Sequence, residues 1–318
     1  MAKKKALVCG IGGQDGSYLA KFLLEKGYEV WGTSRDYEGR AFSNLKTLNV
    51  FSKIQLLSVA VEDYHSVFRA LKKSNPDEIY YLAGQSSVSL SFEQPVETIE
   101  SMTLGVINFL NAIRELNIST KFYNAGSSEC FGDSIGVPVN EDTCFNPRSP
   151  YGIAKVAAYS LVSNYCEAYS MFACTGILFN HESVFRPDNY VTQKIVQAVK
   201  NINQGLQDKL ELGRLDISRD WGWAPEYVEA MWLMLQQDKP KDYVIGTGKA
   251  HSLEDFVSEA FGFFDMDWRQ YVVINNNLMR PTDILYSCAN PINAKNQLDW
   301  EAKTHMSGVI HKMINLDI

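Results

Sequence analysis

Three glycines near the N-terminus constrain the fold more than any other feature of this 318-residue chain. Gly10, Gly13 and Gly16 follow a short apolar run, and hydrophobic residues at helical spacing occupy 18–24. The first glycine permits a tight turn out of a strand, the next lets a pyrophosphate approach the backbone, and the last lets helix and strand pack closely. The pattern predicts a strand, a glycine turn and a helix whose first N–H groups face phosphate.

Strand and helix patterns alternate along the first 180 residues. Short runs of apolar and β-branched residues predict strands at 6–9, 29–33, 55–60, 78–83, 121–125, 173–178 and, later, 242–245. Helical periodicity lies between them at 64–72, 96–116 and 151–170. Such alternation is typical of an α/β protein, and we predict a Rossmann-type, doubly wound parallel sheet with helices on both faces.

The regular alternation of predicted strands and helices ends at about residue 180. Beyond it, helical patterns at 192–203 and 225–237 are joined by shorter elements. No Pro/Gly/Ser-rich linker separates the two parts. We therefore predict a nucleotide-binding domain over 1–180, with returning segments near 220–250, and a smaller α/β substrate lobe built mainly from 181–318.

Composition excludes several other classes of protein. Hydrophobic residues make up 46% and charged residues 21%, and the formal net charge of −7 offers no field that gathers nucleic acid. The sequence contains neither an apolar stretch long enough for a membrane span nor a secretion signal, so we expect a cytoplasmic protein. The six scattered cysteines are expected to be reduced core residues, and no cysteine or histidine spacing suggests a metal site.

A tyrosine and a lysine four residues apart form the most informative chemical pair. A helix that begins near Pro150 would place Tyr151 and Lys155 on one face, and an adjacent ammonium is expected to lower the pKa of the phenol. Such a phenol can act as general base on a substrate alcohol, which Ser127 could hold in place. Taken alone, a Tyr-x-x-x-Lys pair is more often simply part of a solvated helix surface, and the rest of the chain has to decide between the two interpretations.

The end of the second predicted strand indicates the cofactor. A carboxylate there favours NAD, whereas an arginine nearby favours the 2′-phosphate of NADP. The sequence has Arg35 followed by Asp36, and we predict NADP with Arg35 as the phosphate ligand. The alternative is that Arg35 pairs with Asp36 or with solvent.

Taken together, these motifs resemble those of the extended short-chain dehydrogenases/reductases, and most closely the GDP-mannose 4,6-dehydratase family. The resemblance covers nearly the whole chain, and its matching segments are residues 13–19, 127–132, 147–155, 176–183, 219–222 and 231–237. The sequence departs from the family pattern at a few positions, which are Ala60, Asp36, Ser127, Arg214 and Asp283. Because several of these lie where the family holds its nucleotides, the sugar nucleotide is less constrained than the chemistry.

The resemblance implies roles for individual residues. The implied catalytic set is Ser127, Glu129, Tyr151 and Lys155. The implied NADP contacts are Gly10, Gly13, Gln14, Asp15, Gly16, Arg35, Asp63, Leu82, Ala83, Tyr151 and Lys155. The implied substrate contacts are Ser86, Asn180, Arg186, Lys194, Arg219 and Arg280. The resemblance also implies a homodimer or homotetramer, in which the helices at 96–116 and 151–170 pair with their counterparts.

The implied reaction is loss of water from a GDP-sugar with internal recycling of NADP. Tyr151 would take a proton from the C4 hydroxyl, and Glu129 would remove the C5 proton and assist departure of the C6 hydroxyl. Glu129 could instead be a helix-terminal carboxylate bound by backbone N–H groups. Arg186 and Lys194 could be surface cations.

Three alternative functions stay open at this stage. The first is 4,6-dehydration of a GDP-heptose or GDP-N-acetylhexosamine. The second is a nucleotide-sugar reductase or epimerase, against which Glu129 argues. The third is a catalytically silent NADP-binding regulator.

Overall fold

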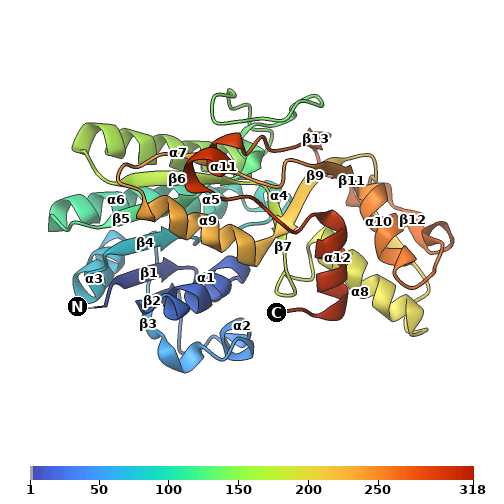
Figure 1. Ribbon diagram of the computed structural model, residues 1–318, viewed down its shortest axis with the longest axis horizontal. Coiled ribbons are helices and arrows are strands. Elements are labelled where there is room, and N and C mark those ends of the chain that lie inside the picture. Colours follow the sequence, from blue (N-terminus) through green and yellow to red (C-terminus); the bar gives the residue numbers. More distant parts are fainter. Residues whose placement is uncertain (1–2) are drawn as a thin grey trace.

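Seven parallel strands form the main sheet of the computed structural model, which describes residues 3–318 (Figure 1). The strand order is β10-β6-β5-β4-β1-β2-β3, and every neighbouring pair is parallel. The strands are β1 (Lys5–Cys9), β2 (Glu29–Ser34), β3 (Gln55–Ser58), β4 (Glu78–Tyr81), β5 (Lys121–Ala125), β6 (Ala173–Leu178) and β10 (Tyr243–Ile245). The predicted fold class is confirmed, and each predicted strand is present with its ends shifted by at most two residues. The order reverses between β1 and β4, the kind of switch point at which open α/β sheets bind ligands.

Helices cover both faces of this sheet. One face packs against α1 (Gln14–Glu25) and α9 (Ala224–Gln236), which lie in front of the sheet in Figure 1. The other face packs against α3 (Tyr64–Ser74), α6 (Gly105–Leu116) and α7 (Pro150–Tyr169). Alternate β1 residues point to opposite faces, so Ala6 and Val8 join the first core and Leu7 and Cys9 the second. Short elements complete this part of the chain: α2 (Ser43–Thr47), α4 (Val88–Glu93), α5 (Pro95–Ile99), η1 (Phe51–Lys53) and η3 (Ser128–Cys130).

The helix predicted over 96–116 is interrupted by one π turn, η2 (Glu100–Leu104). The Tyr81 hydroxyl donates to the Ser101 carbonyl at 2.6 Å, and the Gly105 N–H bonds the Glu100 carbonyl, five residues back. A side chain at Gly105 would collide with the Tyr81 hydroxyl. The prediction of one uninterrupted helix is therefore wrong at this turn, because a tyrosine from the sheet takes the carbonyl that an α-helix would use.

The second lobe has its own core. It is built on α8 (Val191–Asn203), α10 (Leu253–Gly262) and α12 (Met306–Asn315), which pack around Trp221 and Phe256. Its strands are β7 (Asn180–Glu182), β9 (Ser218–Trp223), β11 (Ala250–Ser252) and β13 (Tyr286–Ser287) in one sheet, and β8 (Leu210–Leu212) with β12 (Val272–Ile274) in a parallel pair. Shorter elements are α11 (Ile292–Leu298), η4 (Trp268–Gln270) and η5 (Asn276–Leu278).

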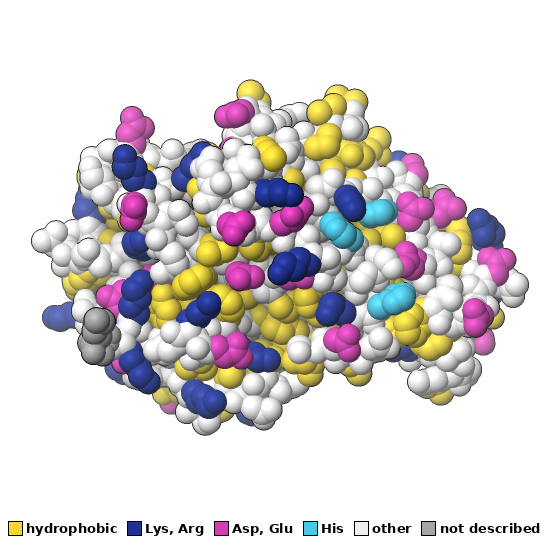
Figure 2. Space-filling model, in the orientation of Figure 1, with side chains coloured by type: hydrophobic (Ala, Val, Ile, Leu, Met, Phe, Trp, Pro, Cys, Tyr) yellow, Lys and Arg dark blue, Asp and Glu magenta, His cyan; other side chains and the backbone are white. Residues whose placement is uncertain are grey.

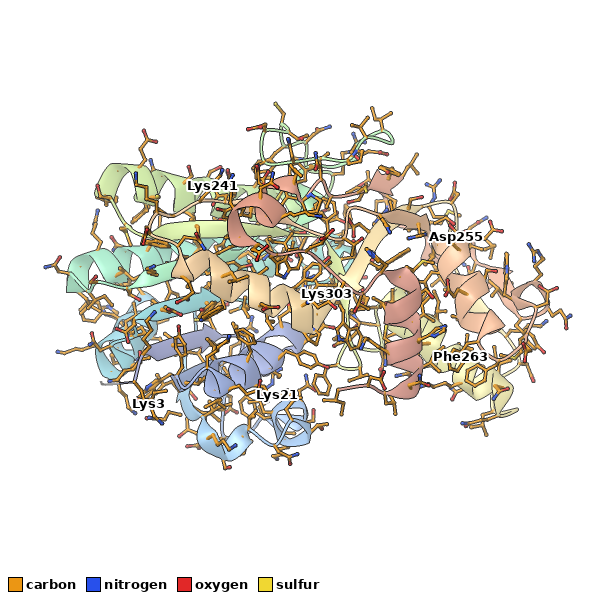
Figure 3. The ribbon with its side chains drawn as sticks, viewed as in Figure 1. Lys3, Lys21, Lys241, Asp255, Phe263 and Lys303 are labelled. Carbon is orange, nitrogen blue, oxygen red and sulfur yellow. The ribbon has the colours of Figure 1, made fainter. Side chains whose placement is uncertain are left out.

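Local polar contacts fix the ends of elements in this lobe. Ser252 and Asp255 form a reciprocal capping box at the start of α10, where Figure 3 labels Asp255. The buried Asp220 accepts hydrogen bonds from the backbone N–H groups of Thr247, Gly248 and Ala289. Asp220, which follows the predicted substrate ligand Arg219, thereby holds two segments, at 247–248 and at 289, against β9.

The surface carries charges of both signs, and the cysteines are reduced. On the face seen in Figure 2, Lys and Arg side chains alternate with Asp and Glu rather than forming one basic area. The six cysteines are free, and four of them, Cys9, Cys130, Cys174 and Cys288, are buried. Within residues 3–318, no helix combines the length and the apolar character needed to span a bilayer.

Candidate active site

The predicted functional residues follow neighbouring strands at one edge of the main sheet. Gly10 follows β1, Leu82 follows β4, and Ser127 comes two residues after β5. Backbone hydrogen bonds join these segments, from Gly10 N–H to the Thr33 carbonyl at 3.3 Å and from Leu82 N–H to the Cys9 carbonyl at 3.1 Å. Because carboxyl ends of parallel strands meet at one edge, the sheet itself assembles the candidate site.

The glycine turn has the geometry of a phosphate-binding loop. Gly10 has φ of +80°, and a Cβ there would lie 2.9 Å from the Leu82 carbonyl oxygen. A Cβ on Gly16 would collide with the Gly10 carbonyl, so α1 packs directly on the turn. Among the residues that the structure describes, no side chain caps the N-terminus of α1 at Gly13. The first N–H groups of α1 therefore fit the pyrophosphate of a dinucleotide, which also meets the positive end of the helix dipole.

Two predicted cofactor residues in the first turn of α1 bind the protein itself. Gln14 Nε2 donates to the His181 carbonyl at 3.2 Å, and the Ser183 hydroxyl donates to Gln14 Oε1 at 2.8 Å. Asp15 Oδ2 lies 2.9 Å from His181 Nε2. Burial by itself raises the pKa of Asp15, but the charge and hydrogen bond of His181 outweigh it and lower that pKa to about 2. Gln14 and Asp15 thus join the glycine turn to the start of the second lobe.

Tyr151 and Lys155 lie one turn apart on α7, which begins as predicted. Ser149 caps the helix by accepting from Gly152 N–H at 3.0 Å, and Pro150 occupies the first helical position. Lys155 Nζ lies 5.7 Å from the centre of the Tyr151 ring and donates to the Ala125 carbonyl at 2.7 Å.

The protonation of this pair differs from the prediction. Burial lowers the pKa of Lys155 to about 8. Burial also raises the pKa of Tyr151 above its ordinary value, although the interaction with the Ser127 side chain acts in the opposite direction. The expected lowering of the phenol pKa by Lys155 is wrong in this structure, because desolvation of the phenolate dominates.

Glu129 lies in η3, two residues after Ser127, whose hydroxyl accepts from the Glu129 N–H at 3.3 Å. Burial raises the pKa of the Glu129 carboxyl, while the charges of Arg219 and then Arg280 lower it. The Glu129 charge also raises the pKa of Tyr151, so the carboxyl and the phenol act on each other. A carboxyl with a raised pKa that interacts with a phenol has the features of a general acid/base group.

Two predicted substrate cations meet beside Glu129. Arg219 is buried and donates to the Ile284 carbonyl at 2.7 Å and to Asp283 Oδ1 at 3.1 Å. Arg280 Nη1 lies 3.6 Å from the same Asp283 oxygen, and its Nε donates to Ser89 Oγ at 3.0 Å. Asp283, noted above only as a departure from the family pattern, therefore bridges the two guanidinium groups.

The other predicted substrate ligands occupy several elements. Ser86 Oγ lies 2.7 Å from the Tyr190 hydroxyl, and Asn180 begins β7, where it is half-buried. Arg186 Nε donates to Glu182 at 2.6 Å, and the Arg186 charge contributes to the low pKa of Asp15. Arg186 therefore lies on the side of the glycine turn. Lys194, on α8, donates to the carbonyl of Glu211 in β8 at 2.6 Å.

Of the remaining predicted cofactor residues, only Leu82 and Ala83 lie directly beside the glycine turn in the part of the chain that the structure describes. Leu82 and Ala83 are half-buried beside Gly10. Asp63 is the N-cap of α3 and accepts from His65 N–H at 2.9 Å. Arg35 is 62% exposed and pairs with Glu97 at 3.1 Å.

Sequence reasoning missed two residues at the site. His181 stands in the recognised segment 176–183 but received no role, although it pairs with Asp15. Arg40 lies over Gly12, with Nη2 donating to the Gly12 carbonyl at 3.4 Å. The only signal for Arg40 in the sequence is its charge, five residues beyond Arg35.

The sheet order, the glycine turn and the Ser127, Tyr151 and Lys155 set define an extended short-chain dehydrogenase/reductase. In agreement, the structure superposes on the NAD-bound dTDP-glucose 4,6-dehydratase of Bacillus anthracis with a TM-score of 0.84 at 17% identity, covering 98% of this chain and 96% of that one. At this level of identity, the structural similarity shows a shared fold and nothing more.

Sequence comparison identifies the family within this class. A family model described as GDP-mannose 4,6 dehydratase matches residues 7–313. GDP-mannose 4,6 dehydratase 1 of Arabidopsis thaliana is 44% identical over 326 residues, covering 99% of this chain and 90% of the relative. The human GDP-mannose 4,6 dehydratase is 38% identical over 338 residues, covering 98% and 91%. The chain belongs to the GDP-mannose 4,6-dehydratase family.

Proposed function

We propose that this protein is an NADP-dependent nucleotide-sugar 4,6-dehydratase, a hydro-lyase that converts GDP-mannose to GDP-4-keto-6-deoxymannose. The observation that carries the proposal is family membership over nearly the full chain, with 44% identity to a relative named for this reaction. The geometry of the site adds support, since a phenol, a lysine and a half-buried carboxyl follow β5 and start α7 beside a dinucleotide-type glycine turn.

Oxidation at C4 of the sugar requires a base. Tyr151 accepts the proton of the C4 hydroxyl, and the Ser127 hydroxyl orients that oxygen. When bound at the glycine turn, NADP supplies the redox chemistry by taking a hydride from the sugar and returning it within the same turnover. Lys155 Nζ lies 5.7 Å from the Tyr151 ring, and its positive charge would partly offset the desolvation that raises the pKa of the phenol.

Elimination of water requires a second acid/base group, and Glu129 has the position and chemistry for this role. A ketone at C4 acidifies the neighbouring C5 hydrogen, which the Glu129 carboxylate removes. The same carboxyl, now protonated, gives its proton to the departing C6 hydroxyl, which leaves as water. C5 must regain a proton as the hydride is returned to C6, and the proton that Tyr151 took from the C4 hydroxyl balances it. The raised pKa caused by burial suits a group that must take and then give a proton.

We assign the substrate contacts to residues around the candidate site at the carboxyl edge of the main sheet. Arg219 and Arg280 supply cations beside Glu129, where guanidinium groups can bind phosphate or ribose oxygens of the GDP moiety. Ser86 and Asn180 are assigned to the sugar and the first phosphate. Arg186 and Lys194 are kept as outer contacts to the nucleotide.

An oligomer is part of the proposal. The helices α5–α6 and α7 expose several apolar side chains outside the site: Val96 (66% exposed), Ile99, Leu104, Ile153 (53%) and Tyr169. These helices would pair with their counterparts in a homodimer, with a homotetramer as the next level of assembly. The six free thiols support a reducing, cytoplasmic location.

A substrate panel tests the proposed function. The purified protein is incubated separately with GDP-mannose, a GDP-heptose, a GDP-N-acetylhexosamine and UDP-glucose, with no added reductant, and products are read by mass spectrometry. GDP-mannose is expected to lose one water fastest. Water loss from another sugar only, or a requirement for stoichiometric NADPH, would contradict the proposal.

A further inference from the structure

The segment between β2 and α2 forms a turn around Asp36. Asp36 Oδ1 accepts hydrogen bonds from the backbone N–H groups of Glu38 and Gly39, both at 3.0 Å. A Cβ on Gly39 would meet the Asp36 carboxylate, so a larger residue there would require this side chain to move. The carboxylate is therefore occupied in closing a turn that reverses the chain.

This turn returns Arg40 to the glycine turn. A Cβ on Gly12 would lie 2.9 Å from Arg40 Nε and 3.0 Å from Cζ, and Arg40 Nη2 donates to the Gly12 carbonyl at 3.4 Å. The guanidinium carbon also lies 5.7 Å from the ring of the buried Phe42, which supports the side chain from below. The guanidinium thus lies over the middle of the loop, whose Gly10 bonds to Thr33 in β2.

Arg35, at the end of β2, points to other partners. Its Nη2 lies 3.1 Å from Glu97 Oε1 and 3.5 Å from Glu62 Oε1. Two carboxylates already neutralise this guanidinium, and a phosphate would have to compete with both. Arg40, in contrast, contacts only a backbone carbonyl and an aromatic ring among its interactions in the described residues.

We propose that Arg40, rather than Arg35, supplies the cation that binds the 2′-phosphate of the NADP adenosine, and that Asp36 acts as the turn residue that positions Arg40. This inference rests on the proposed function for the identity of the cofactor. The adenosine ribose of a dinucleotide lies between the glycine turn and the end of the second strand, which is the region Arg40 covers. A planar guanidinium matches the geometry of phosphate oxygens and keeps its charge at all working pH values. A carboxylate saturated by two backbone N–H groups is poorly suited to accept from ribose hydroxyls.

Nucleotide titration of the full-length protein tests the assignment. The dissociation constants of NADPH and NADH are measured by nicotinamide fluorescence for the wild type and for Arg40→Ala, Arg35→Ala and Arg114→Ala. Loss of one charged hydrogen bond predicts about 10- to 100-fold weaker NADPH binding for Arg40→Ala, with NADH binding within about twofold. Arg35→Ala should weaken NADPH binding by less than about threefold. Arg114, which bonds Asn111 on the far part of α6, is the matched control and should leave both constants unchanged.

Two substitutions at Asp36 separate a turn residue from a ribose ligand. Asp36→Asn keeps an oxygen that can accept the same two N–H bonds and should preserve NADPH binding. Asp36→Ala removes that acceptor and should weaken NADPH binding in the direction of Arg40→Ala.

The opposite pattern would overturn the inference. If Arg35→Ala abolishes the preference for NADPH while Arg40→Ala leaves it intact, Arg35 is the ligand. If Asp36→Asn selectively weakens NADH, Asp36 binds the ribose. The titrations contain no sugar nucleotide, so their result is independent of whether GDP-mannose is the substrate.

Discussion

Asp15 and His181 pair across the two lobes, with Asp15 Oδ2 2.9 Å from His181 Nε2. Asp15 belongs to the first turn of α1, and His181 is the middle residue of β7. The other ring nitrogen of His181 bonds the Phe179 carbonyl at 2.7 Å, and the ring stacks on Tyr227 with centroids 4.6 Å apart. The imidazole is thereby fixed, and it holds the glycine turn against the start of the second lobe.

This pair predicts a defined acid sensitivity. The pKa of Asp15 is about 2 in the folded protein against 3.8 ordinarily, so the pair stabilises the fold above pH 3.8 and this contribution is lost as pH falls through about 2. At neutral pH, Asp15→Asn should lower the free energy of unfolding by about 2 kcal/mol. Urea unfolding at several pH values measures this.

The difference between wild type and Asp15→Asn should shrink as pH falls from about 4 to about 2. The exposed Asp208 gives a control, since Asp208→Asn should leave stability unchanged at neutral pH. A constant difference over the whole range would contradict the ionic account of the pair.

Glu129→Gln should separate binding from elimination. The amide has the same shape but cannot take a proton, so turnover of GDP-mannose should fall by about 10²- to 10⁴-fold. The dissociation constant of GDP-mannose, measured by calorimetry, should change little. Glu167→Gln, at an exposed position of α7, should keep full turnover. Turnover of Glu129→Gln at the wild-type rate would remove Glu129 from the mechanism.

Gly16→Ala tests the close approach of α1 to the glycine turn. Its added Cβ would collide with the Gly10 carbonyl, and overpacking of this kind costs about 1–3 kcal/mol of folding free energy. NADPH binding should weaken with it, because the turn must open to admit the methyl group. Gly262→Ala is the matched control: a Cβ at Gly262, the last residue of α10, meets no atom within 4 Å. That variant should be as stable as the wild type or more so, and equal losses for the two variants would contradict the packing argument.

Ile153→Asp tests the proposed oligomer. Ile153 is 53% exposed on α7, and a charge there would be buried in the proposed helix pairing. Light scattering after size exclusion should show a smaller species than the wild type. Ile135→Asp, at an 88% exposed position in a loop, should assemble as the wild type does. An unchanged mass for Ile153→Asp would place any interface elsewhere.

Local signals in the sequence predicted most of the fold. The glycine spacing, the apolar runs and the helix start at Pro150 each act over a few neighbouring residues, and the structure places β1, α1 and α7 where these signals indicate. The π turn at 100–104 could not be predicted, because its cause is a hydrogen bond from Tyr81, some twenty residues away in the chain.

In the candidate site too, features set by neighbouring residues were predictable from the sequence, and contacts between distant residues were not. The Tyr151 and Lys155 pair depends on helical spacing alone, and the spacing is present. Contacts such as Asp15 with His181, or Arg219 with Asp283, join residues far apart in sequence, and no periodicity encodes them. The protonation of Tyr151 was mispredicted because desolvation depends on what the whole fold packs around the phenol.

Transfer of the C4 hydrogen within the sugar tests the central claim most directly. GDP-mannose carrying deuterium at C4 is incubated with the protein and unlabelled NADP, and the product is analysed by mass spectrometry and NMR. The proposed mechanism predicts a 4-keto-6-deoxy product that retains the deuterium at C6. Recovery of unlabelled product, or of a sugar that has kept its C6 hydroxyl, would contradict it.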